Sequence, residues 1–279
     1  MSWKPRASAL GHYASCLYRA AFDRALAEQA LELPAEVATE IEEKKRSSPY
    51  ADLGTCIHYH LQAGIGATFP AGDHAPTQEQ LINASELFGK DLERTKLAVR
   101  NSAIMASQHL PKLPDGEVWE AEVETRTRYV NGHIDLLNRN AGIIVDLKTT
   151  SRPPLHPTIK PAHLIQLLTY VDGIEQAAGS PEIPVLKTAM ILYVDAQGAS
   201  WALPISVDLH SEGMIEYRLQ ARELAKLCAS KSLYKVAFPN VGETCNEWCP
   251  YTSICRDKYR SPAGEVVRAT GPKLKGPLG

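Results

Sequence analysis

The sequence predicts a mixed α/β domain built around one central sheet with helices packed against it. Two observations favour this fold class. Apolar residues recur at helical spacing up to about residue 109, and from about residue 118 they alternate with polar residues. The chain then returns to a helical pattern and to a further strand. An all-helical or all-β protein is thereby excluded, and an α+β arrangement is the remaining alternative.

The first part of the chain is expected to be helical in three places. Residues 8–32, residues 51–64 and residues from about 78 to 109 carry apolar side chains at helical spacing. A polar stretch at 42–50 separates the first from the second, and a stretch rich in proline and glycine separates the second from the third. We therefore expect helices ahead of the sheet in the chain.

The sheet is predicted to begin as a meander of three strands. Alternating segments lie at 118–130, 132–137 and 142–150, and residues typical of turns separate them. A proline-rich linker follows the third strand. The remaining predicted elements are an amphipathic helix at 162–179, strands at 185–195 and 200–208, and a helix at 211–230.

Composition limits what the chain as a whole can do. With 279 residues, of which 44% are hydrophobic, it can bury one large core carrying a smaller lobe. The formal charge of -2 provides no overall field that attracts nucleic acid or anionic lipid, so any site for a polyanion must be local. No run approaches the roughly 18 apolar residues of a membrane span, and the N-terminus lacks the apolar region of a signal peptide. We expect a cytoplasmic protein that does not bind membranes.

Three of the six cysteines are grouped near the C-terminus. They are Cys245, Cys249 and Cys255, in a segment that otherwise reads as a turn. In a reducing compartment such grouped thiols are more often metal ligands or catalysts than disulfides. The scattered cysteines are Cys16, Cys56 and Cys228. The last two are expected to be small buried apolar residues.

Two charged residues interrupt the apolar run of the third predicted strand. Asp146 and Lys148 are two positions apart, so the period of a strand turns them to the same face. Pairing with the preceding strand can bring Asp135 beside them. Two carboxylates at the end of a sheet suit a hard cation such as Mg²⁺, and a lysine on that face can activate water or stabilise a phosphate. A solvated surface ion pair is the alternative reading.

Four ordered elements resemble the RecB-like branch of the PD-(D/E)XK nuclease superfamily. GHID followed by VDLK resembles the signature that names the superfamily, GTCIH resembles the Gly-x-x-x-His element that precedes it, and QLLTY resembles the Gln-x-x-x-Tyr helix that follows. Cys16 with the C-terminal trio is similar to the iron-sulfur version of this branch, found in CRISPR-associated RecB-like exonucleases and AddB-type helicase-nucleases. The trio departs from the expected spacing, since three residues rather than two fill its first gap.

The resemblance, which covers about residues 8 to 257, implies a restriction-endonuclease-like core with a central mixed sheet, joined to an iron-sulfur lobe that connects the N- and C-terminal segments. The implied metal ligands are His58, Asp135, Asp146 and the backbone carbonyl of Leu147. The implied catalytic residues are Asp135, Asp146, Lys148, Gln166 and Tyr170. The implied ligands of a 4Fe-4S cluster are Cys16, Cys245, Cys249 and Cys255, with structural zinc as the alternative cofactor.

The function implied by the resemblance is hydrolysis of DNA phosphodiesters with Mg²⁺ or Mn²⁺, by an exonuclease acting on single strands or DNA ends. The alternatives are a catalytically weak DNA-handling subunit of a larger complex and an unrelated iron-sulfur redox protein. Recombination, helicase or CRISPR adaptation proteins are the expected partners. The expected divisions of the chain are an N-terminal helical segment at 1–50, a nuclease core at 51–235, a cysteine segment at 236–259 and a tail at 260–279.

Overall fold

The computed structural model describes residues 3–28, 33–45, 48–152, 158–177, 186–197, 201–230, 232–233, 249–251 and 255. Its helices are α1 (Ala7–Ser15), α2 (Leu17–Ala27), α3 (Ala35–Lys45), α4 (Pro49–Gly64), α5 (Gln78–Ser85), the short 3₁₀ helix η1 (Glu86–Phe88), α6 (Leu92–Ser107), α7 (Pro161–Ala177) and α8 (Glu212–Ala229). Its strands are β1 (Glu120–Arg126), β2 (Asn131–Asn138), β3 (Ile143–Thr150), β4 (Thr188–Asp195) and β5 (Ala202–Val207).

The strands form one five-stranded sheet in the order β1-β2-β3-β4-β5. Strands β1, β2 and β3 are antiparallel neighbours, β4 runs parallel to β3, and β5 is antiparallel to β4. The crossover from β3 to β4 contains α7, as a parallel connection requires. The predicted meander and the predicted mixed α/β sheet are therefore confirmed.

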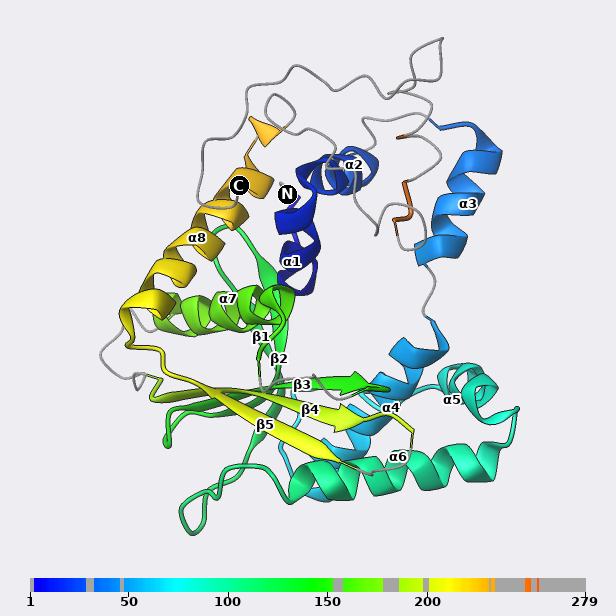
Figure 1. Ribbon diagram of the computed structural model, residues 1–279, viewed down its shortest axis with the longest axis vertical. Helices are drawn as coiled ribbons and strands as arrows, with labels where there is room; N and C mark the ends of the chain where they lie inside the picture. Colours follow the sequence, from blue (N-terminus) through cyan, green and yellow to red (C-terminus); the bar gives the residue numbers. More distant parts are fainter. Residues whose placement is uncertain are drawn as a thin grey trace.

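Helices cover both faces of the sheet (Figure 1). On one face α7 lies across the strands, with α1 and α8 packed against it. On the other face α4 contacts β3 and α6 contacts β4. Strand β4 is buried on both sides: Ile191 belongs to the core beneath α7, whereas Leu192 belongs to the core beneath α4 and α6. This two-sided burial explains why the β4 sequence is almost continuously apolar.

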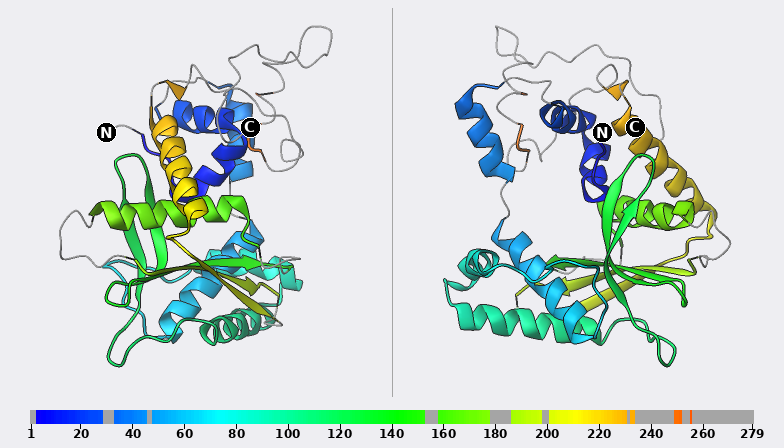
Figure 2. Two further views of the ribbon diagram at one scale, coloured as in Figure 1. Left: turned by 60° about the vertical axis from the view of Figure 1, so that its left-hand side comes forward. Right: turned by 180° about the vertical axis from the view of Figure 1, so that it is seen from behind.

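The hairpin formed by β1 and β2 leaves the plane of the sheet part-way along its length. Pairing between β2 and β3 covers only Leu136 to Asn138 of β2, whereas β1 remains paired with β2 as far as Asn131. Figure 2 shows the outer part of this hairpin rising beside α7 and α1. The bend coincides with Glu122, whose φ of 50° lies in the left-handed region that L-residues rarely adopt.

Two of the predicted long helices are interrupted, and one helix was not predicted. Cys16 is extended, with φ -155° and ψ 99°, and it separates α1 from α2 within the predicted helix at 8–32. Left-handed residues Gly89 and Lys90 divide the predicted helix at 78–109 between η1 and α6. Helix α3 extends into the stretch at 42–50 that we predicted to be a polar separator, and only Ile41 of this helix is buried.

Two segments far apart in the sequence, helices α2 and α3 and the stretch around Tyr251, meet in a small apolar cluster formed by Phe22 of α2, Ile41 of α3 and Tyr251. Cys249 and Cys255 pack against this cluster. The scattered cysteines Cys56 and Cys228 are fully buried, as expected of small apolar residues. None of the described helices combines the length and the apolar character needed to cross a membrane.

Candidate active site

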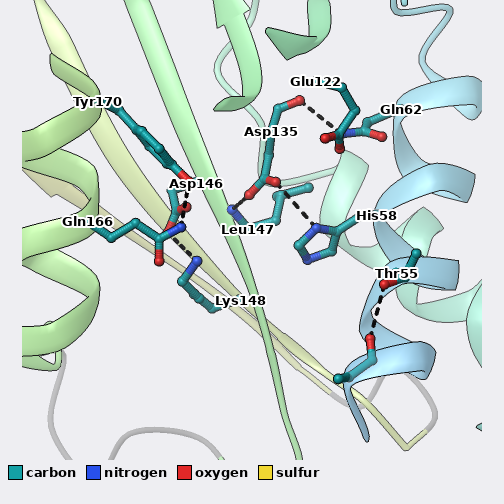
Figure 3. Close-up of polar contacts among 11 residues, drawn as sticks. Thr55, His58, Gln62, Glu122, Asp135, Asp146, Leu147, Lys148, Gln166 and Tyr170 are labelled. Carbon is teal, nitrogen blue, oxygen red and sulfur yellow. Dashed lines mark hydrogen bonds and ion pairs between the residues drawn. The ribbon is translucent and has the colours of Figure 1, made fainter. Parts of the chain in front are cut away.

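Asp135 lies where β2 separates from β3. The last pair between these strands is Leu136 with Val145, so one further step would place Asp135 opposite Asp146. Instead, Asp135 Oδ2 accepts a hydrogen bond from the backbone amide of Leu147 at 2.6 Å (Figure 3). The side chain thus occupies the gap between the diverging strands, where residues from both faces of the sheet can reach it.

Asp146 and Lys148 lie side by side on β3, as the spacing of two residues predicts. Lys148 Nζ is 2.7 Å from Asp146 Oδ2, and the Asp146 side chain is only 1% exposed. Neither buried oxygen of Asp146 meets the geometric criterion for a hydrogen bond among the described residues, so the charge of Lys148 is what compensates this carboxylate. A buried carboxylate whose pKa stays raised despite such a partner is typical of functional sites.

Helix α4 brings His58 to the same place from the opposite face. His58 Nδ1 lies 3.5 Å from Asp135 Oδ1. The approach depends on Gly54, because a Cβ at that position would lie 2.7 Å from Thr149 Oγ1 on β3. Helix α4 begins with Ser48, whose side chain accepts a hydrogen bond from the Ala51 amide, and with Pro49 in its first turn.

Helix α7 brings Gln166 and Tyr170 to the site one turn apart. Gln166 Nε2 donates a hydrogen bond to the Tyr170 hydroxyl at 2.7 Å, and both residues are buried. A Cβ at Gly132 would lie 2.6 Å from Tyr170 Cε1, so the glycine of GHID is needed for the hairpin to pack against this ring. Figure 3 shows Gln166 and Tyr170 on the same side as Asp146 and Lys148.

A protein-family model described as the PD-(D/E)XK nuclease superfamily matches residues 7–256. The chain belongs to the PD-(D/E)XK nuclease superfamily. This membership excludes the alternative of a redox protein unrelated to the superfamily, and it indicates a nuclease.

Comparisons with curated proteins and with solved structures add no functional information. No curated protein matches the chain. Among solved structures, one titled "Crystal structure of SSO0001" is similar, at 15% sequence identity and a TM-score of 0.35, over 82% of this chain and 95% of that chain.

Burial and mutual contact shift the pKa values of the charged residues in the PD-(D/E)XK site. Burial raises the pKa of Asp146 to about 6; Lys148 opposes this shift and Asp135 adds to it. Burial acts against ionisation of Asp135, but His58, Lys148 and the Leu147 amide together outweigh it, and the pKa of this carboxyl is lowered. Burial likewise acts against a charged Lys148, yet Asp146 and Asp135 raise its pKa above the ordinary value. Burial also opposes a charged His58, and Asp135 raises its pKa.

Members of this superfamily generally use divalent metal ions. The donor types here fit such an ion, because the buried Asp146 carboxylate, whose oxygens lack a hydrogen-bond partner among the described residues, lies beside a second carboxylate and an imidazole. Within the described part of the chain, however, no three His, Cys, Asp or Glu side chains are grouped closely enough to hold a metal ion. In this structure Lys148 contacts the Asp146 oxygen that a metal ion would need.

The predicted cysteine ligands are only partly within the described residues. Cys16 lies between α1 and α2, and Cys249 and Cys255 lie beside α2 and α3. Cys245 falls outside the described residues, so the complete set of four remains a prediction.

The sequence analysis missed Gln62, a buried residue of α4 that contacts the site. The spacing of four residues between His58 and Gln62 could have indicated it, because residues four apart in a helix lie on the same face.

Proposed function

We propose that this protein is a DNA exonuclease that requires Mg²⁺ or Mn²⁺. The observation that supports the proposal is the approach of His58, Asp135 and Asp146 to Lys148 where β2 and β3 diverge. These residues come from a helix on one face and from two strands, and the residues of α7 flank them from the other face. Such convergence is not expected of a solvated surface ion pair.

The cation would be held by His58, Asp135, Asp146 and the backbone carbonyl of Leu147. Asp135 is already oriented by the Leu147 amide at one oxygen, which leaves its other oxygen toward His58. When bound, a divalent cation supplies polarisation of the scissile phosphate and a more acidic water. It would also add positive charge beside that of Lys148, and so lower the pKa of the Asp146 carboxyl from about 6.

Lys148 is placed to act on the phosphate and on the attacking water. Because the neighbouring carboxylates raise its pKa, the ammonium form is favoured. We therefore assign it to orientation of the water and stabilisation of phosphate charge, rather than to removal of a proton. Gln166 and Tyr170 would fix the wall of the site next to Asp146 and provide polar groups for a DNA phosphate.

The proposed substrate is single-stranded DNA or a DNA end. The formal charge of -2 requires phosphate contacts to be local. Such contacts weaken as salt rises, because the release of DNA counterions into a more concentrated salt solution gains less free energy. The sequence contains no recognisable zinc-finger or helix-turn-helix module that reads bases, which favours cleavage independent of sequence.

We also propose that Cys16, Cys245, Cys249 and Cys255 bind a 4Fe-4S cluster. Packing of Cys249 and Cys255 against the cluster of Phe22, Ile41 and Tyr251 supports this assignment, because it brings the C-terminal cysteines to α2, the helix that follows Cys16. The test is iron, sulfide and zinc analysis of anaerobically purified protein, wild type and Cys16→Ala. Iron and sulfide that fall in the variant support the cluster, whereas stoichiometric zinc without iron supports the structural-zinc alternative.

A DNA-handling subunit without strong nuclease activity is the second candidate. The observation that favours it is the contact of Lys148 with Asp146, which occupies the carboxylate that a metal needs. In that case recombination, helicase or CRISPR adaptation proteins would supply the catalytic step in a complex.

The experiment that tests the proposal is degradation of end-labelled single-stranded and double-stranded DNA by anaerobically purified protein with Mg²⁺, Mn²⁺ or EDTA. Lys148→Ala is the test variant. Lys187→Ala is its control, because Lys187 immediately precedes β4 at the opposite end of the β3–β4 pair from Lys148. We expect metal-dependent degradation that Lys148→Ala loses and Lys187→Ala keeps. Wild-type protein that binds DNA but leaves every substrate intact would support the DNA-handling subunit instead.

A further inference from the structure

Gln62 is a buried residue of α4 whose side-chain amide donates two hydrogen bonds. Its side chain is 1% exposed, and it lies one helical turn after His58. Gln62 Nε2 donates one hydrogen bond to Glu122 Oε1 at 2.9 Å and another to the backbone carbonyl of Asp135, also at 2.9 Å. Both hydrogens of the amide are thereby used. Figure 3 shows Gln62 reaching from α4 toward Glu122 and Asp135, beside His58.

The two acceptors of Gln62 stand at an interruption in the sheet. The pairs Ala121 with Leu136 and Val123 with Ile134 keep one register, which would place Glu122 directly opposite Asp135. That pair is missing from the ladder, and Glu122 is the left-handed residue at the bend of the hairpin. A backbone conformation of this kind persists only where its surroundings hold it.

The interruption leaves Asp135 without ordinary strand partners on both sides. Toward β3, the Asp135 carboxylate bonds the Leu147 amide where the ladder has ended. Toward β1, the amide of Gln62 bonds the Asp135 carbonyl where the ladder is interrupted. A backbone carbonyl without a hydrogen-bond partner is unfavourable. The Gln62 amide therefore provides the partner that β1 does not provide for the Asp135 carbonyl.

Helix α4 therefore contacts Asp135 at two points. His58 faces its carboxylate and Gln62 holds its carbonyl, from positions that share one side of the helix. We propose that Gln62 is a positioning residue that braces the bent hairpin and so fixes the Asp135 carboxylate relative to His58. Glu122 is the second anchor of this brace. The inference rests on the proposed function for its kinetic consequence, but the contacts of Gln62 do not depend on it.

The test compares Gln62→Met, which keeps the length of the side chain and removes both donors, with the exchange variant Gln62→Glu/Glu122→Gln. The exchange lets residue 122 donate to residue 62, but it removes the amide that bonds the Asp135 carbonyl. The measured quantities are kcat and KM on end-labelled DNA, and Mn²⁺ affinity from the electron paramagnetic resonance signal of free Mn²⁺. Thermal unfolding reports whether each variant is folded.

We expect Gln62→Met to lower kcat and Mn²⁺ affinity by about 10- to 100-fold, as for other residues that orient a metal ligand, with KM for DNA changed by less than about 3-fold. The exchange variant restores the contact between residues 62 and 122, and hence folding where Gln62→Met is unstable, without restoring kcat or Mn²⁺ affinity. Wild-type values for Gln62→Met, or full recovery in the exchange variant, would overturn the assignment.

The Mn²⁺ measurement separates this inference from the proposed function. Wild-type protein that binds Mn²⁺ without degrading DNA refutes the exonuclease, and the affinity of Gln62→Met then still tests the brace. Equal Mn²⁺ affinity in both proteins, alongside wild-type degradation of DNA, refutes the brace alone.

Discussion

Two regions of the molecule bring distant segments together, and they do so by different means. At the acidic site the sheet register and helices on both faces hold His58, Asp135 and Asp146 in place. At the termini, a small cluster of Phe22, Ile41 and Tyr251 joins segments more than two hundred residues apart in the sequence. The first arrangement is supported by the core of the domain, whereas the second depends on a few side chains.

The terminal region is centred on Asp23. Its carboxylate accepts a hydrogen bond from the Tyr13 hydroxyl at 3.0 Å and another from the Tyr251 hydroxyl, and Lys45 Nζ lies 2.8 Å away. The ring of Tyr251 stacks on Phe22 with centroids 5.0 Å apart. These contacts connect α1, α2, α3 and Tyr251 without using a cysteine. The comparison indicates that disturbance of the acidic site affects chemistry first, whereas disturbance of the termini affects stability first.

The largest effect is expected for His58→Gln. Loss of an implied metal ligand should reduce metal-dependent DNA degradation by about 100- to 1000-fold. His60→Gln is the matched control, because His60 is two residues further on the same helix, is exposed and contacts only the Cys56 carbonyl among its described hydrogen-bond partners. Rates from end-labelled DNA check the pair. Equal rates of DNA degradation for the two variants would show that His58 is not a metal ligand needed for activity.

Asp146→Asn is expected to stabilise the protein, although it removes an implied metal ligand. The pKa of Asp146 is about 6 in the folded protein, against an ordinary value of 3.8, so ionisation costs folding free energy. The folded state holds the proton more tightly, hence stability falls as pH rises from about 4 to 6 and stays low above that. The neutral amide avoids this cost and should raise the free energy of unfolding at pH 7 by up to about 3 kcal/mol.

Chemical denaturation at pH 7 and at pH 4 checks the Asp146→Asn prediction, since the gain should nearly vanish at the lower pH. Asp172→Asn is the contrasting variant, because Asp172 is buried but bonds Arg222. It should destabilise the protein, because Arg222 loses one of its two acceptor oxygens and the negative charge that faces it. A destabilised Asp146→Asn at both pH values would contradict the account that burial of this carboxylate outweighs its contact with Lys148.

A smaller effect is expected for Gly54→Ala. The added Cβ would meet Thr149 Oγ1 at 2.7 Å and should push α4 from β3, at a cost of about 1–2 kcal/mol and about tenfold in activity. Gly64→Ala is the control, because a Cβ at this position of α4 has no neighbour within 4 Å. Thermal unfolding and DNA degradation check both variants. Combination with Thr149→Ala, which removes the obstructing hydroxyl, should recover much of the Gly54→Ala loss.

The smallest effect on activity is expected at the termini. Asp23→Asn weakens the bonds from Tyr13, Tyr251 and Lys45, and should cost about 1 kcal/mol in stability. DNA degradation should change by less than about 3-fold, since Asp23 lies outside the acidic site. Thermal unfolding and degradation rates measured together check this. An activity loss as large as that of His58→Gln would show that the two regions are coupled.

Much of the sheet could be predicted because strand alternation is a local property of the sequence. The spacing of two residues between Asp146 and Lys148 determined that they share a face, and the turn at 139–142 determined that Asp135 approaches them. The breaks at Cys16 and Gly89 were not predicted, because apolar residues continue at helical spacing through both positions.

The bracing contact of Gln62 could not be predicted from a helical pattern. Its acceptors are the Glu122 side chain and the Asp135 carbonyl, at a bend in the sheet. This bend coincides with the left-handed conformation of Glu122, and glutamate rarely adopts that conformation, so its presence in the sequence does not predict a bend. The nuclease motifs implied that His58 and Gln166 belong to one site with the acids, which periodicity alone could not indicate, and the structure brings both residues near these acids.

The most direct test of the central claim, that the site between β2 and β3 holds the divalent cation, is anomalous diffraction from crystals grown with Mn²⁺. The account predicts a peak bounded by Asp135, Asp146 and His58, with Lys148 displaced from Asp146, and its loss in Asp135→Asn crystals. An active protein whose Mn²⁺ peak lies elsewhere, or persists unchanged in that variant, would contradict the account.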